Sequence, residues 1–131
     1  MEFTDHLKSQ GTERRLTTHD TPKHNGVAES LNHQVLECVW AVLHHSSLPK
    51  FLWGEAVLHA VWLKNRTSTR ALKSLTPFEA LTGKKLNLSN LPEWGTKVWV
   101  HDNTNSKLEG HSKVGRWVGF DAESMHTHRI Y

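Results

Sequence analysis

The chain has 131 residues with a hydrophobic share of 37%, which is enough for one ordinary domain or for parts of two. Its formal charge of +3 at pH 7, to which 11 histidines would add in mild acid, permits nucleic-acid binding without requiring it. The single Cys38 excludes an internal disulfide framework, no apolar run is long enough to span a bilayer, and the first residues lack a signal-peptide pattern. We therefore expect an intracellular protein, in the nucleus or the cytoplasm, without a membrane partner.

The first half of the chain is predicted to be mainly helical. Residues 2–10 favour a short helix that Gly11 closes, and residues 14–18 favour a short strand because they combine leucine with threonines. A long helix is expected over residues 27–46, where apolar side chains recur at helical spacing. The next predicted helix, over residues 50–64, is apolar almost all round, so it must be buried or must meet a partner.

A polar loop follows, with two arginines, Arg66 and Arg70. Two interpretations stay open for this loop: a solvated connection, or a source of contacts to nucleic-acid phosphates. The sequence then carries a helix-start signal, because Thr76 is a good N-cap, proline follows it, and Glu79 comes three residues later. We predict a short helix over residues 76–82.

The pattern changes after residue 95, where short runs rich in β-branched and aromatic residues replace helical periodicity. Strands are predicted over residues 97–101, 115–120 and 127–131. Together with the preceding helices, these strands place the chain in the α+β class.

The most informative stretch is the start of the long helix, where the turn-forming run His24-Asn25-Gly26 stops. Glu29 falls in the first helical turn whether Asn25 or Gly26 is the N-cap. Exposed N–H groups and the helix dipole favour an ionised carboxylate at that place, and a hard cation such as Mg²⁺ requires such a ligand. The alternative interpretation is a helix-start acid with no further role.

The run Thr-Pro-Lys-His-Asn-Gly-Val-Ala-Glu at residues 21–29 resembles the third-acid motif of copia-type retrotransposon integrases. Four further motifs match the same family in the same order, over nearly the whole chain: Leu-Pro-Lys-Phe-Leu-Trp-Gly-Glu-Ala (48–56), Lys-Asn-Arg-Thr (64–67), Thr-Pro-Phe-Glu-Ala-Leu-Thr-Gly-Lys-Lys (76–85) and Trp-Val-Gly-Phe (117–120). The resemblance implies the helical C-terminal half of a ribonuclease H-like integrase core over residues 1–83. A linker over 84–94 and a partial small antiparallel β-barrel over 95–131, truncated at its C-terminus, would follow.

The resemblance also implies a chemistry, which is metal-dependent phosphoryl transfer during DNA integration. In that family the matching glutamate completes an Asp-Asp-Glu triad that holds two divalent metals, Mg²⁺ or Mn²⁺. Glu29 is accordingly the candidate catalytic and metal-binding residue. We expect weak contacts to DNA, and also to RNA, from five further residues: Lys23, Asn25, Asn32, Arg66 and Arg70.

The chain departs from the family pattern at Ser30 and His33, where the family usually places basic residues, and Asp5, Glu13 and Asp20 do not match the other two acids. We therefore predict that the chain alone performs no strand transfer and retains no metal. The alternative function is a non-catalytic module, derived from a transposon, that binds nucleic acid or protein. In either case, helices without the sheet that covers them in the family should self-associate through exposed apolar faces.

Overall fold

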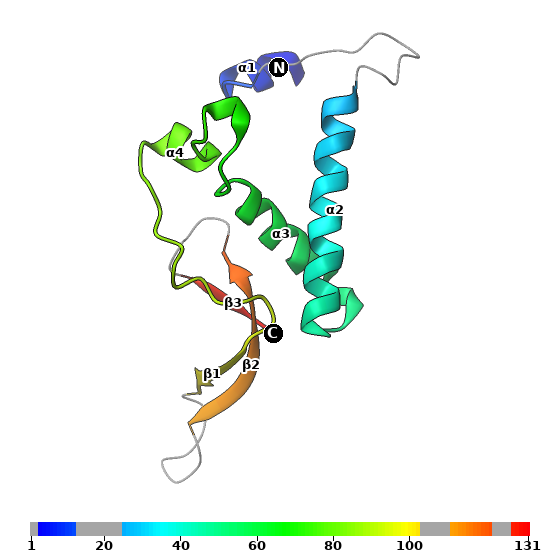
Figure 1. Cartoon of the computed structure of the whole chain (residues 1–131), viewed down its shortest axis with the longest axis vertical. Coiled ribbons are helices and arrows are strands. Elements are labelled where there is room, and N and C mark those ends of the chain that lie inside the picture. The colour runs from blue at the N-terminus through cyan, green and yellow to red at the C-terminus, as the bar shows by residue number, and fades with distance from the viewer. Residues whose placement is uncertain (1–2, 13–24, 103–110, 122–126) are drawn as a thin grey trace. The chain divides into compact units, whose positions relative to one another are not determined.

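The computed structural model describes residues 3–12, 25–102, 111–121 and 127–131 (Figure 1). The described elements are α1 (Phe3–Ser9), α2 (Gly26–Ser46), the 3-10 turn η2 (Lys50–Leu52), α3 (Trp53–Lys64), the 3-10 turn η3 (Arg70–Leu72), α4 (Pro77–Thr82), β1 (Lys97–His101), β2 (Ser112–Phe120) and β3 (His128–Ile130). The predicted strand over residues 14–18 and the predicted contact residue Lys23 lie outside the described residues. None of the described helices is long and apolar enough to cross a membrane.

The chain divides into two compact units, Met1–His33 and Gln34–Tyr131, and helix α2 contributes to both. In the first unit, α1 buries none of its residues and ends at Ser9, and Gly11, two residues later, has a φ of +69°. Glycine suits this end because the left-handed conformation strains residues that carry a Cβ atom. The predicted helix and its glycine stop are thus confirmed.

The core of the second unit forms where the C-terminal half of α2 meets α3, near the turn that joins them (Figure 1). Val39 and Leu43 lie one turn apart on α2, and both are buried. They face α3 at Ala56 and Ala60, whose small side chains are almost fully buried and allow close packing. The helix over 50–64 is therefore buried along one stripe, not all round, and its start is a 3-10 turn.

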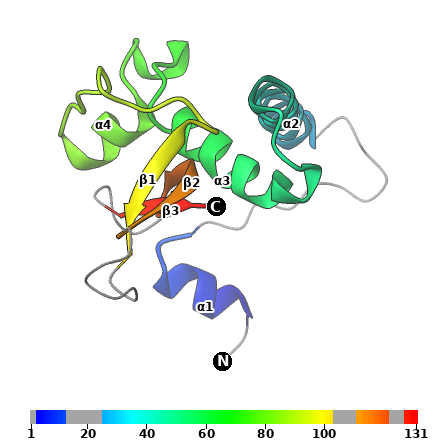
Figure 2. The same ribbon diagram turned by 90° about the horizontal axis from the view of Figure 1, so that it is seen from below.

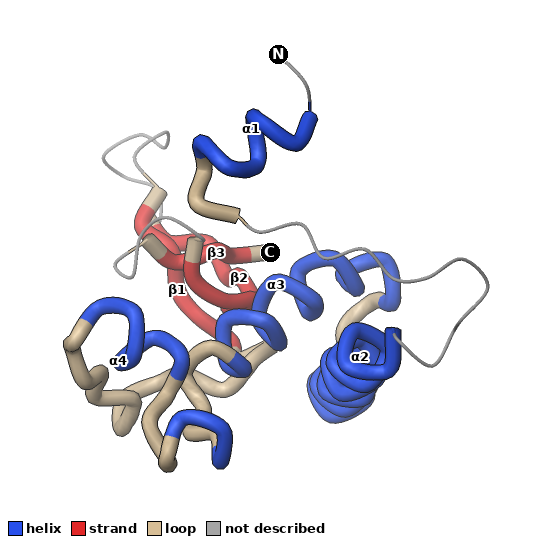
Figure 3. Tube along the Cα trace, turned by 90° about the horizontal axis from the view of Figure 1, so that it is seen from above, coloured by secondary structure: helices blue, strands red, loops and turns tan. Residues whose placement is uncertain are grey.

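The three strands form an antiparallel sheet in the order β1-β2-β3 (Figures 2 and 3). The register between β2 and β3 shifts between Trp117 and Gly119, and Gly119 adopts a φ of +127°. Such an irregularity bends a strand locally. The bent end of β2 packs against α3, where Val118 joins the helical core.

The predicted start of the short helix is confirmed in detail. The Thr76 hydroxyl oxygen accepts a hydrogen bond from the Glu79 N–H at 3.0 Å, and a Glu79 carboxylate oxygen accepts one from the Thr76 N–H at 2.9 Å. Strand β1 matches its predicted range. Strand β2 starts at Ser112, three residues before the predicted start, because Ser112, Lys113 and Val114 pair with β1.

The predicted linker over residues 84–94 ends in a residue that packs in the core. Trp94 is only 4% exposed, and its indole N–H donates to the Val118 carbonyl at 3.0 Å. The domain assignment over 1–83 and 95–131, with its ribonuclease H-like core and barrel, stays a prediction.

Candidate functional site

Glu29 lies in the first turn of α2, as the sequence predicted, and its side chain is exposed. Asn25 immediately precedes this helix and Asn32 lies about one turn beyond Glu29; both are exposed. These three residues belong to the unit Met1–His33, whereas Arg66 and Arg70 belong to the unit Gln34–Tyr131. The predicted contact residues therefore form two groups.

A divalent metal needs more oxygen ligands than Glu29 provides. Among the described residues, no group of three or more histidine, cysteine, aspartate or glutamate side chains could hold a metal ion. Mg²⁺ demands near-octahedral coordination and gives up its water reluctantly, so one carboxylate fixes it only weakly. The described residues by themselves do not fit the two-metal site that the family resemblance implies.

Arg66 is held between two aromatic rings and is not a freely solvated loop residue. Its guanidinium carbon lies 4.0 Å from the centroid of the Trp62 ring and 4.8 Å from that of Phe78. One Nη atom donates to the Trp62 carbonyl at 3.2 Å, while the buried Nε has no hydrogen-bond partner among the described residues. Burial lowers the pKa of Arg66 from its usual value. The cation thus connects α3 to α4, and Arg70 is the more exposed arginine of the two.

A cluster of aromatic rings connects α3 to the sheet. His59 stacks on Trp62 at a centroid distance of 6.3 Å and meets the edge of Trp117 at 5.5 Å. The Trp117 indole N–H donates to Nδ1 of His128 at 2.9 Å. Phe120 packs against both Trp117 and His128.

His59 is the buried polar residue that sequence reasoning missed. It is 5% exposed, and its Nδ1 has no hydrogen-bond partner in the described part of the chain. Burial lowers the pKa of His59 to about 4, because the charged ring would lose its hydration. The sequence held one signal, since His59 comes three residues after Ala56 on the face of α3 that enters the core.

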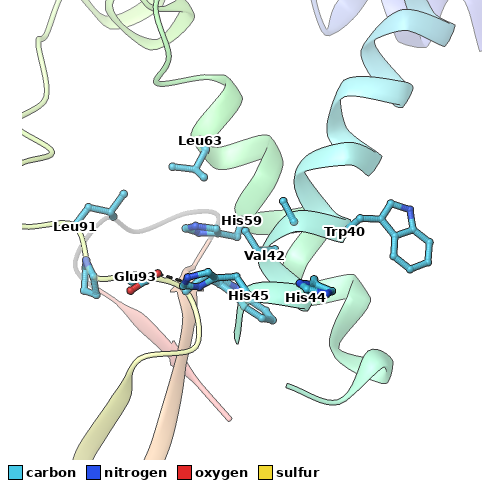
Figure 4. A pocket seen from close by; sticks show the side chains of 11 residues that line it. Trp40, Val42, His44, His45, His59, Leu63, Leu91 and Glu93 are labelled. Carbon is cyan, nitrogen blue, oxygen red and sulfur yellow. Dashed lines mark ion pairs between the residues drawn. The ribbon is translucent and has the colours of Figure 1, made fainter. Parts of the chain in front are cut away.

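A cavity of about 980 Å³ opens beside His59 (Figure 4). Its walls come from the end of α2, from α3 and from residues 91–94, and they are mainly apolar. His45 Nδ1 lies 3.1 Å from a Glu93 carboxylate oxygen, in a pair whose side chains are both mostly exposed. The Trp40 side chain points away from the cavity (Figure 4). The size and lining are typical of pockets that take apolar groups. The sequence could not reveal the cavity, because its lining comes from three distant segments.

Comparisons with known proteins show which proteins the chain is similar to. The chain is similar over nearly its whole length to segments of retrovirus-related Pol polyproteins from plant transposons, which supports a transposon-derived polyprotein segment. It is 34% identical over 126 residues, 95% of the chain, to the polyprotein from transposon TNT 1-94 of Nicotiana tabacum. Identities to the Arabidopsis thaliana polyproteins from transposons RE2 and RE1 are 32% over 118 residues (88% of the chain) and 29% over 136 residues (97%).

The chain spans about a tenth of the length of these curated relatives: 10%, 8% and 9%, respectively. No family model matches the chain. No solved structure matches it.

Proposed function

We propose that the chain is the segment of a copia-type retrotransposon integrase that carries the third catalytic acid, together with the small barrel region that follows. The observation that carries this proposal is the position of Glu29. It is an exposed carboxylate in the first turn of a 21-residue helix, within a chain similar to transposon Pol polyproteins. The helix N-terminus stabilises the ionised form of such an acid, and the length of the helix fixes its position.

The neighbours of Glu29 suit a polynucleotide substrate. Asn25 and Asn32 place exposed amide groups on either side of Glu29 along the chain, and such groups hydrogen-bond phosphate oxygens. Lys23 precedes this helix in the sequence and adds a cation that can contact the phosphate backbone in the same sequence-independent way, and Arg70, in the other unit, provides a separate cation of this kind. Because the described residues provide one of the three carboxylates, we propose that the chain alone is inactive and that strand transfer requires the complete triad.

A chimeric polyprotein tests the role of Glu29. In it, this chain replaces the aligned segment of the tobacco relative, and metal-dependent joining of DNA ends is measured. We expect the chimera to be active and Glu29→Gln to abolish joining while DNA binding stays almost unchanged. The matched control is Glu37→Gln, which makes the same change two turns further along α2 and should leave joining intact. Full activity of the Glu29→Gln chimera would refute the assignment.

The isolated chain provides a second test. It should nick no DNA in Mg²⁺ or Mn²⁺, with or without Glu29→Gln. Metal-dependent nicking that disappears in the variant would contradict the proposed inactivity and mean that a second chain provides the other acids.

A non-catalytic binding module is the second candidate, and exposed apolar side chains favour it. Trp40 is 65% exposed and Trp53 is 61% exposed, and both line a small apolar groove between α2 and the start of α3. Large exposed rings of this kind mark interaction surfaces. An inactive chimera that still binds DNA or protein through these residues would favour the module over the integrase segment.

A further inference from the structure

One surface of the sheet combines an exposed tryptophan with positively charged side chains. In β1, alternate residues point to the same side, and the antiparallel register places their partners from β2 beside them. The resulting outer sheet face consists of Lys97, Trp99, His101, Ser112, Val114 and Arg116. All six residues are exposed, whereas Val98 and Val100 on the other side of β1 are partly buried.

Trp99 is the centre of this face. Its side chain is 66% exposed, and its cross-strand neighbour Val114 is 52% exposed, so the indole is accessible to solvent beside a small aliphatic side chain. An exposed indole contributes little to the core. A flat aromatic ring on an open sheet is instead well suited to stack on another planar group.

Two cations lie next to this ring. The Lys97 ammonium is 5.0 Å from the centroid of the Trp99 ring, and Arg116 lies directly across from Lys97. The Arg116 guanidinium is held by a hydrogen bond to the Gly95 carbonyl at 3.1 Å. None of the six residues of the outer sheet face is acidic, and Asp102, the acid that follows β1, pairs with Lys113 on the opposite side.

The combination of ring and cations selects one class of partner. An acidic protein would satisfy the cations but would leave the indole without a planar group to cover it. In duplex DNA the bases are stacked on one another, so a ring on a flat sheet cannot reach their faces. A single strand offers unstacked bases next to phosphates at a spacing of a few ångströms, and proteins bind it through aromatic rings beside basic groups.

We propose that the outer sheet face binds single-stranded nucleic acid, with a base stacked on Trp99 and the adjoining phosphates on Lys97 and Arg116. The inference rests on the proposed function in so far as an integrase segment handles polynucleotides, but it uses none of the residues around Glu29. Its failure is therefore distinguishable from failure of the integrase assignment, which the joining assay of the Glu29 chimera decides.

The test measures fluorescence anisotropy of a labelled oligothymidylate of about 12 nucleotides with the full 131-residue chain. Trp99→Ala should weaken binding by about tenfold or more, because stacking of one base on an aromatic ring is lost. Trp99→Phe, which keeps an aromatic ring, should retain most of the affinity. The matched control is Phe51→Ala, since Phe51 is 67% exposed but lies on η2, and it should bind like the wild type.

The cations are tested through salt dependence. Lys97→Gln and Arg116→Gln should each reduce the slope of log affinity against log salt by about 0.7, the value for one phosphate contact to a single strand. Lys50→Gln, a surface lysine on η2, should leave the slope unchanged. Three outcomes would overturn the proposal: no binding by the wild type, unchanged binding by Trp99→Ala, or duplex DNA that competes as well as the single strand.

Discussion

Acidification provides a quantitative test of how α3 packs on the sheet. His59 lies in this interface between Trp62 and Trp117, and the backbone of Gly119 passes beside its ring. Burial lowers its pKa from 6.5 to about 4. Other titratable groups around this interface are Arg66, stacked over Trp62, and His128, hydrogen-bonded to Trp117, and His45 and Glu93 line the same cavity as His59.

The sign of the effect follows from the direction of this pKa shift. The unfolded chain takes up a proton at His59 near pH 6.5, whereas the folded chain does so only near pH 4. Between these values the unfolded state binds more protons than the folded state. The contribution of a neutral His59 to the free energy of unfolding is therefore fully present above pH 6.5 and is lost as the pH falls toward 4. For acidification from about pH 7.5 to about pH 4.5, linkage gives a loss of about 2.5 kcal/mol of unfolding free energy.

The assay is urea denaturation followed by circular dichroism at several pH values, with wild type and His59→Phe compared. Phenylalanine keeps an aromatic ring beside Trp62 but cannot titrate, so the variant should lose about 2.5 kcal/mol less than the wild type over this range. All other titratable groups are common to both proteins and cancel in the difference. His44→Phe, at an exposed position near the end of α2, should lose as much unfolding free energy on acidification as the wild type. Equal acid losses in wild type and His59→Phe would refute the reasoning.

Three further predictions concern stability and association. Arg129 donates from Nε and Nη2 to the two carboxylate oxygens of Glu55 at 2.7 and 2.6 Å. Because the pair is partly solvated, Arg129→Ala should lower the unfolding free energy by about 1 kcal/mol in the same denaturation assay, and adding Glu55→Ala should lower it no further. Thr76→Ala should cost about 1 kcal/mol through loss of the N-cap, whereas Thr76→Ser should cost little. The isolated chain should bind an apolar dye and elute from a size-exclusion column at a volume that depends on its concentration, and Trp40→Lys and Trp53→Lys should reduce both effects. A monomer that binds no dye would contradict this expectation.

The sequence predicted the features that depend on neighbours along the chain. The capping box at Thr76 and Glu79 involves two residues three apart, so it could be recognised directly and was found as expected. The position of Glu29 at a helix start follows from the turn residues before it, and the structure places it there. The strand of alternating exposure that carries Trp99 was likewise recognised from its β-rich composition.

The features that depend on tertiary contacts could not be predicted. The contact between Arg66 and the Trp62 ring could have been expected, since Arg66 follows the end of α3 four residues after Trp62, but Phe78 reaches Arg66 only through the fold. His59 looked like one polar interruption in an apolar helix, because nothing nearby in the sequence indicates that β2 covers it. The outer sheet face required the register that places Arg116 opposite Lys97.

The burial of Trp94 limits how this segment can be cut or exchanged. The indole fills the space beside Val118, and its N–H satisfies a carbonyl in the strand that packs on α3. A fragment that starts at residue 95 would lose this side chain and would leave Ala56 and Ala60 without part of their cover. Grafts between relatives should therefore keep α2, α3 and β2 in one piece, because recombination within the predicted linker would separate parts that share a single core.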